Sequence, residues 1–384
     1  MSKKKILLIG TLASKGGIQT HLKWQSKALT EGKNQVLVIS MKSLCGQDTE
    51  ELKLFQNDLV EFTFFNNDNG KDFFSRFKYL WTLFKKIKDF EPDIYIVAGT
   101  TINASLCALL LNNDKTKTVF FEVVTGYYRG WLKYLTKFCY NEIIAISNTI
   151  KQNLNESLNW QKEIPVLMAF PEPLEISAQL PQVESKIIPL GKAKAAFFSR
   201  LAPHKQPFWL VQQWDFLKNY LDELHIHGSG SEESLIRDYI EEKGIGDKVK
   251  CFGRYPDGQA YVDLLSSYDL TLLPTIGNEG SPLVLLESMA CGVPFVAYGV
   301  GGIPDYGYNN PDVIVVPPEP WLTTQAREYT TTSPQGEIKA FLAGVQIMAE
   351  KLTRGEINQL RLQQFYFNNY SYNVLKQKWL SYLK

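Results

Sequence analysis

The stretch LTLLPTIGNEGSPLVLLESMACGVPFVA, residues 270–297, decides the fold class. It opens and closes with short apolar runs, and a helix-length segment lies between them. In that segment we expect Ser281 as the N-cap residue, Pro282 as the first helical residue and Gly292 as the residue that ends the helix. A strand, a helix and a second strand in this order are typical of a parallel sheet covered by helices.

The rest of the chain repeats this alternation of short apolar runs and segments of helical period. An aperiodic segment with three prolines, residues 170–188, is expected to link two domains, residues 1–180 and 181–360. We therefore predict an α/β protein with two Rossmann-like, doubly wound domains that face each other across a cleft. Besides the two apolar runs above, strands are expected at Lys5–Gly10, Gln35–Ser40, Asp93–Ala98, Thr118–Val123, Ile143–Ile146, Ala195–Ser199, Glu223–His227 and Val249–Phe252.

The composition excludes several classes of protein. Of the 384 residues, 45% are hydrophobic, and 41 basic and 40 acidic residues give a net charge of +1. A disordered chain is less hydrophobic, and a nucleic-acid-binding domain is more basic. The five scattered cysteines contain no Cys-x-x-Cys pair, which favours neither a zinc site nor a disulfide framework. We expect a cytoplasmic protein without a membrane-spanning helix, because no apolar run reaches about 18 residues.

Two glutamates, Glu279 and Glu287, stand eight positions apart around the start of the expected helix. The helical neighbours of Glu287 at three and four positions are apolar, so its carboxylate needs strong hydrogen bonds, which the paired hydroxyls of a ribose would supply. Glu279 lies just outside the helix N-terminus, whose free N–H groups around residues 281–284 attract negative groups. The alternative for Glu287 is an exposed position on a surface helix.

Two cations follow the strand that ends at Ser199. Arg200 and Lys205 lie in a short loop before the next helix. Arg offers a bidentate fork and Lys a point charge, and together they suit a diphosphate. A pair of ordinary surface cations is an equally good interpretation of these two residues alone.

Glycines mark further strand-end loops. Gly16 and Gly17 follow the first strand, where they would let the backbone approach a phosphate closely. The G-x-G-x-x-G fingerprint of a dinucleotide site is absent. His21 falls one turn into the next helix and, taken alone, is more often structural than catalytic. Gly228 and Gly253 follow later strands, and each alone indicates only a turn.

The combination resembles the family 4 retaining glycosyltransferases of the GT-B fold over nearly the whole chain. The E-x7-E element of that family matches as Glu279 and Glu287. Its G-R-L-x-x-x-K-G loop keeps Arg200 and Lys205 but has both glycines replaced. The GGIQTH segment resembles the family's G-G-x-E-x-H start, with Gln19 in place of the acid.

One departure concerns the strand that reads TVFFEVV. The family commonly carries a His at its end, where this chain has Val124. Glu122 lies two residues earlier, on the same side of the strand by alternation, and would partly replace the His. The alternative for Glu122 is a carboxylate at the rim or in a salt bridge.

The resemblance implies that a nucleotide-diphosphate sugar binds along the C-terminal domain and that the N-terminal domain holds most of the acceptor. It also implies that a C-terminal helix, residues 361–384, packs back on the first domain. It implies catalytic roles for Glu279, Arg200, Lys205 and Glu122. It also implies that the donor contacts Gly16, Gly17, Gly228, Gly253, Arg254, Gly280, Ser281, Pro282, Leu283 and Glu287.

The activity implied is the retaining transfer of a hexose to a glycan or lipid-linked glycan acceptor in polysaccharide biosynthesis. The preferred donor is UDP-glucose or a close relative. No cofactor is expected. Because no apolar-flanked Asp-x-Asp pair is found, the Arg/Lys pair would replace a metal in stabilising the leaving group. The alternatives are a nucleotide-sugar epimerase of the same fold and a non-catalytic scaffold or binding subunit.

A segment of helical period, residues 73–90, combines an apolar stripe with basic residues around it, and residues 126–138 are similar. Both segments suit an anionic membrane surface, at the inner face of the cell membrane, where they would receive lipid-linked acceptors. The alternative is a crossover helix that packs on the sheet by the same stripe, since residues 73–90 lead directly into a strand. The stripe consists of Phe73, Phe74, Phe77, Leu80, Trp81 and Phe84.

Overall fold

The computed structural model describes residues 3–10, 12, 16–41, 52, 55–64, 73–99, 102–111, 115–128, 131–277, 279–318 and 339–384.

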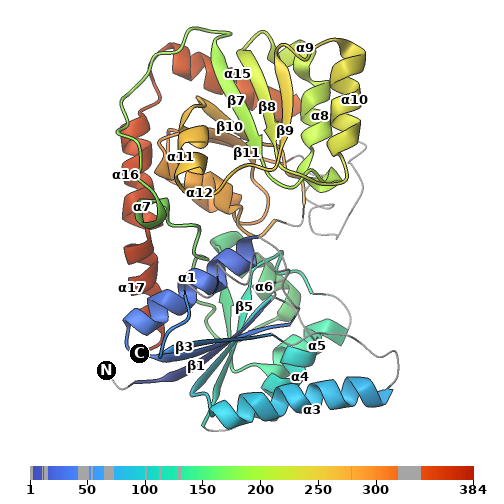
Figure 1. Ribbon diagram of the computed structural model, residues 1–384, viewed down its shortest axis with the longest axis vertical. Coiled ribbons are helices and arrows are strands. Elements are labelled where there is room, and N and C mark those ends of the chain that lie inside the picture. Colours follow the sequence, from blue (N-terminus) through green and yellow to red (C-terminus); the bar gives the residue numbers. More distant parts are fainter. Residues whose placement is uncertain are drawn as a thin grey trace. The chain divides into compact units, whose positions relative to one another are not determined.

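The chain divides into two compact units (Figure 1). The first unit comprises Met1–Glu172 and Tyr372–Lys384, and the second comprises Pro173–Ser371. The chain therefore changes unit inside the expected linker, before residue 180. The reason is the short helix α7 (Leu174–Ser177), which packs on α11 (Gly258–Ser266) and α12 (Leu283–Ala290) of the second unit.

The first unit contains a six-stranded parallel sheet with the strand order β3-β2-β1-β4-β5-β6. The edge strand β3 is absent from the sequence prediction, because only Val60 among its five residues is buried and no apolar run marks it. The strands are β1 (Lys5–Gly10), β2 (Gln35–Ser40), β3 (Val60–Phe64), β4 (Ile94–Ala98), β5 (Lys117–Glu122) and β6 (Glu142–Ala145).

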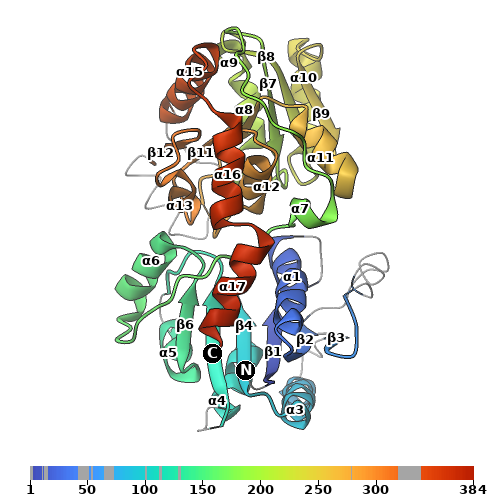
Figure 2. The same ribbon diagram turned by 90° about the vertical axis from the view of Figure 1, so that its left-hand side faces the viewer.

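Helices cover both faces of this first sheet (Figure 1). On one face α3, α4 and α5 lie side by side, and on the other α1 packs with α17. Figure 2 shows α17 running beside α1. The helices are α1 (Gly17–Glu31), α3 (Phe73–Phe90), α4 (Ile102–Leu111), α5 (Trp131–Cys139), α6 (Asn148–Leu158) and α17 (Tyr372–Tyr382).

The second unit contains another six-stranded parallel sheet, with the order β12-β11-β10-β7-β8-β9. Taken in chain order, both sheets follow the 3-2-1-4-5-6 arrangement of doubly wound nucleotide-binding folds, in which ligands bind at the carboxyl ends of the strands. The three-residue edge strand β12 is too short to be recognised in the sequence. The strands are β7 (Ala193–Phe198), β8 (Leu221–His227), β9 (Val249–Gly253), β10 (Leu270–Leu273), β11 (Phe295–Tyr298) and β12 (Ile314–Val316).

Besides α7, α11 and α12, the second unit has several further helices around its sheet. They are the 3₁₀ helix η1 (Pro203–Lys205), α8 (Pro207–Gln212), α9 (Trp214–Leu217), α10 (Glu233–Lys243), α13 (Ile303–Gly307), α15 (Lys339–Thr353) and α16 (Gln359–Asn369).

The C-terminal segment consists of two helices, whereas one helix over 361–384 was expected to pack on the first domain. α16 belongs to the second unit, because the amide of Gln363 donates to Ala290 O over 2.8 Å and Arg361 forms an ion pair with Asp312. α17 belongs to the first unit, where the buried Trp379 donates from Nε1 to Met168 O over 3.0 Å.

No helix among the residues described above has the length and apolar character needed to cross a bilayer. Nor do these residues bring three or more His, Cys, Asp or Glu side chains together in a way that would hold a metal ion.

Candidate functional site

The loops after β7, β8 and β9 meet through closely packed backbone. Gly228 has φ +140°, and a Cβ there would overlap the carbonyl oxygen of Ser199. The N–H of Gly228 donates to Gly253 O over 2.7 Å. Arg200 follows Ser199, and Arg254 follows Gly253; both side chains are exposed. The structure therefore brings together the predicted residues of three strand ends.

Lys205 and Glu279 form a buried ion pair. Lys205 ends the 3₁₀ helix η1 after β7, and Glu279 lies in the segment between β10 and α12. The two segments are also joined through the backbone, because the N–H of Ile276 donates to His204 O over 3.0 Å. Lys205 and Glu279, which were predicted to act in one site, thus contact each other directly.

The loop before α8 carries concentrated positive charge. Burial, together with the smaller effect of the neighbouring charges of Lys205 and Arg200, lowers the pKa of His204 to about 4. The imidazole of His204 is therefore neutral at physiological pH and adds no charge to the two cations.

The start of α12 differs from the sequence prediction by one residue. The N-cap is Pro282, without a side-chain capping bond, and the helix begins at Leu283. The hydroxyl of Ser281 instead forms a hydrogen bond with the Tyr306 hydroxyl of α13. Gly292 ends the helix as predicted, with φ +70° and its N–H donating to Met289 O over 2.9 Å.

A glycine pair after β11 packs on the backbone of the loop that carries Glu279. This pair was not among the predicted site residues. Gly301 has φ +58°, and a Cβ there would overlap the backbone carbonyl of Glu279. The N–H of Gly302 donates to Gly280 O over 2.5 Å. The available signal was the Gly-Gly pair shortly after a buried strand.

Glu287 is partly buried on α12, among tyrosines. Tyr261 of α11 donates from its hydroxyl to Glu287 Oε2 over 2.7 Å. Burial raises the pKa of Tyr261 well above its usual value, and the nearby charge of Glu287 raises it further. Tyr255 stacks on Tyr261 at 5.1 Å between ring centroids. The exposed-surface alternative for Glu287 does not fit this arrangement.

In the first unit, Gly16 is the N-cap of α1 and Gly17 is its first residue. His21 is buried between aromatic rings, and its Nδ1 accepts from Phe170 N over 3.0 Å. Burial lowers the pKa of His21 to about 3. This geometry agrees with a structural histidine.

Glu122, the last residue of β5, also belongs to the first unit. Its Oε1 accepts from Val124 N over 2.7 Å, and its Oε2 accepts from the Tyr128 hydroxyl. Only 2% of the side chain is exposed, and burial raises its pKa, although these hydrogen bonds oppose the rise. The carboxylate therefore holds its own loop, and its burial does not fit a carboxylate at the rim.

Residues 192–327, all in the second unit, match the family described as glycosyl transferases group 1. This part of the chain is therefore similar to the group 1 glycosyl transferases. The matched range contains Arg200, Lys205, Glu279 and Glu287.

Curated relatives match the chain in part. An exopolysaccharide phosphotransferase of Streptomyces coelicolor is 32% identical over 46% of this chain and 18% of its own length. An uncharacterized glycosyltransferase of Haemophilus influenzae is 29% identical over 59% of this chain and 62% of its own. The chain thus spans less than two thirds of either relative.

A solved structure of similar fold is that of Anabaena HepE in complex with UDP. It superimposes on this chain with a TM-score of 0.71 and 15% identity, covering 99% of both chains. At this identity the likeness shows the shared GT-B fold.

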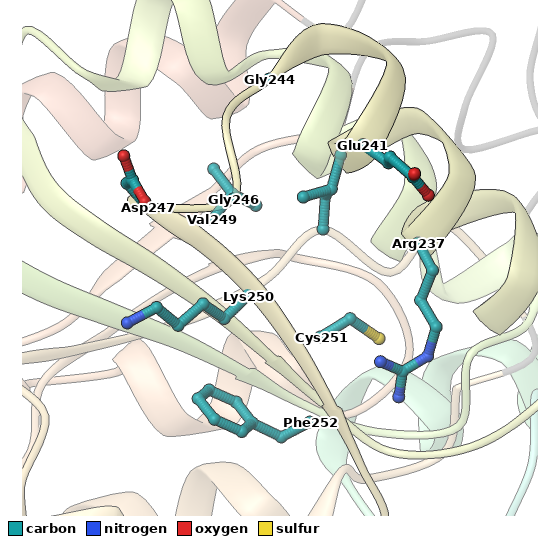
Figure 3. A pocket seen from close by; sticks show the side chains of 10 residues that line it. Arg237, Glu241, Gly244, Gly246, Asp247, Val249, Lys250, Cys251 and Phe252 are labelled. Atoms are coloured by element: carbon teal, nitrogen blue, oxygen red, sulfur yellow. The ribbon is translucent and has the colours of Figure 1, made fainter.

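One depression of the second unit lies away from the predicted site. It has a volume of about 540 Å³ and lies beside the edge strand β9 and the C-terminal end of α10 (Figure 3). Its walls include Arg237, Glu241, Lys250 and Phe252. None of the predicted site residues lines it, so it is not part of the candidate site.

Proposed function

We propose that the chain is a retaining glycosyltransferase that moves a hexose from a nucleotide-diphosphate sugar to a glycan or lipid-linked glycan acceptor in polysaccharide biosynthesis. The observation that carries this proposal is the buried Lys205–Glu279 pair at the carboxyl ends of β7 and β10. A buried ion pair is not a general means of stabilising a fold, so its presence at the ligand-binding edge of the sheet favours a functional role.

The proposed diphosphate site consists of Arg200, Lys205 and the backbone N–H groups at the start of α12. Departure of a nucleoside diphosphate develops negative charge, which fixed cations and helix N–H groups stabilise. Arg200 is exposed and able to contact a ligand, whereas Glu279 fixes the position of the Lys205 ammonium group. We propose that Glu279 also binds donor-sugar hydroxyls.

The proposed ribose site is Glu287. The hydroxyl of Tyr261 fixes one carboxylate oxygen and thereby the orientation of the group. The UDP bound to Anabaena HepE supports uridine as the base, with UDP-glucose as the donor that we would test first. The exopolysaccharide in the name of the Streptomyces relative supports a polysaccharide product.

We propose no protein base for the reaction. The donor's bond between the anomeric carbon and the diphosphate oxygen breaks, the acceptor oxygen bonds to the same face of that carbon, and the acceptor's proton passes to the leaving phosphate. Glu122 is then a positioning residue for residues 123–128, because backbone groups and Tyr128 occupy its oxygens. The scattered cysteines remain the argument for a cytoplasmic location.

Calorimetric titration with UDP and with UDP-glucose in the presence of EDTA tests the donor site. We expect binding that Glu287→Ala abolishes and that Glu241→Ala, at an exposed position on α10, leaves unchanged. Absence of binding to UDP, GDP and ADP alike would contradict the proposal and would favour a scaffold. Conversion of UDP-glucose to a free epimer without transfer would favour an epimerase.

A further inference from the structure

The outer surface of α3, α4 and α5 is unusually apolar. Of the eighteen large hydrophobic residues that are exposed in the described part of the chain, nine lie on these three helices. Six of the nine are aromatic and are between 58% and 80% exposed. The nine are Phe74, Phe77, Trp81, Ile102, Leu109, Leu110, Trp131, Tyr134 and Phe138.

The apolar stripe of α3 does not attach the helix to the sheet. Leu83 and Ile87, one turn apart, are fully buried and make that attachment. Phe74 and Trp81 lie on the opposite side of the helix and face outward. The helix is therefore a crossover helix, but it does not pack on the sheet by the stripe as the alternative expected, and it exposes Phe74, Phe77 and Trp81.

Positive charge accompanies this apolar surface. The three helices contain seven basic residues and one acidic residue, in a chain with a net charge of +1. Lys78 and Lys85 are exposed and follow Phe74 and Trp81 by four positions, which places them on the same helix face. Neither lysine forms an ion pair with another residue that the structure describes.

We propose that the surface formed by α3, α4 and α5 docks on an anionic lipid bilayer. Aromatic side chains at the headgroup level and lysines beside anionic headgroups are the two features that interfacial binding requires. An exposed apolar patch of this extent marks an interaction site. A second copy of the chain fits less well, because a two-fold interface would bring two lysine-rich faces together.

Flotation of the full chain with vesicles tests this docking independently of sugar transfer. We expect binding to phosphatidylcholine vesicles that contain phosphatidylglycerol, weak binding to phosphatidylcholine alone, and release at high salt because exposed charges are screened. The double variant Trp81→Ser, Trp131→Ser and the double variant Lys78→Glu, Lys85→Glu should each lower the bound fraction at least about tenfold.

The matched control is the double variant Ile187→Ser, Tyr308→Ser, which removes two exposed apolar side chains from the second unit. The control variant should bind to the vesicles as strongly as the unchanged chain does. Circular dichroism should show that all variants fold. The proposal is overturned if neither vesicle binds, or if the aromatic and lysine variants bind like the control. It is equally overturned if the chain is a dimer that Trp81→Ser, Trp131→Ser dissociates.

Discussion

The hydroxyl of Tyr261 donates a hydrogen bond of 2.7 Å to Glu287 Oε2, and the two residues come from different helices, α11 and α12. An acidic residue whose helical neighbours are apolar needs such a donor, since a carboxylate without one is costly to bury. The tyrosine supplies it from within the protein. The proposed ribose-binding group is thus held in one orientation before any donor arrives.

Replacing Tyr261 by Phe should weaken UDP binding. The change removes one hydrogen bond to a charged group, which is worth about 1.5 kcal/mol, or roughly tenfold in affinity. Calorimetry measures the loss. Tyr255→Phe removes the hydroxyl of the ring stacked on Tyr261 and should change the affinity much less. Equal effects of the two variants would show that Tyr261 acts only by packing.

Breaking the Lys205–Glu279 pair should destabilise the second unit. Lys205→Met leaves a buried carboxylate without its partner, which costs about 3 kcal/mol. In the double variant Lys205→Met, Glu279→Gln, the free energy of unfolding should fall by less than the sum of the losses in the two single variants. The difference should be at least about 1 kcal/mol. Urea unfolding of the four proteins in a double-mutant cycle measures this coupling. Additive losses would mean that the contact contributes nothing.

Most of the fold could be predicted from the sequence, because the central strands of a parallel sheet are short apolar runs. The edge strands β3 and β12 could not, since only Val60 is buried in the first and the second has three residues. The division of the C-terminal segment depends on long-range contacts such as Gln363 with Ala290, which no local pattern reveals.

The site could be predicted in part. The charged residues of the strand-end loops follow recognisable motifs, and the structure brings Lys205 to Glu279. Tyr261 belongs to no motif, so its bond to Glu287 needed the structure. The capping role expected of Ser281 failed because Tyr306, 25 positions away, takes its hydroxyl. Periodicity identified the stripe of α3 but not the direction in which it faces.

Gly228 should tolerate no side chain. At φ +140° an alanine is strained, and its Cβ would overlap the backbone oxygen of Ser199. We expect Gly228→Ala to lower the free energy of unfolding by about 3 kcal/mol and to abolish UDP binding. Gly246→Ala is the matched control, because the nearest atom to a Cβ there is 3.7 Å away. A normal melting temperature for Gly228→Ala would contradict the close approach of these loops.

Stability should fall as the pH falls below the ordinary pKa of histidine. Burial lowers the pKa of His21 from 6.5 to about 3, so the unfolded chain binds a proton that the folded chain does not. Stability therefore rises with pH across this window, and His21 alone removes about 2 kcal/mol between roughly pH 6.5 and 5. His21→Gln should flatten the dependence of the melting temperature on pH in that range, whereas Lys88→Gln should not. An unchanged slope in His21→Gln would exclude His21 as its source.

Donor cleavage should not require a divalent metal, because Arg200 and Lys205 supply the positive charge for the leaving diphosphate. We expect the slow hydrolysis of UDP-glucose to persist in excess EDTA. Arg200→Ala, at an exposed position, should lower that rate about 100-fold without affecting the fold. Arg237→Ala, which removes a cation beside the depression at β9, should leave the rate unchanged. Complete loss of hydrolysis in EDTA, restored by manganese, would overturn the assignment of this role to the two cations.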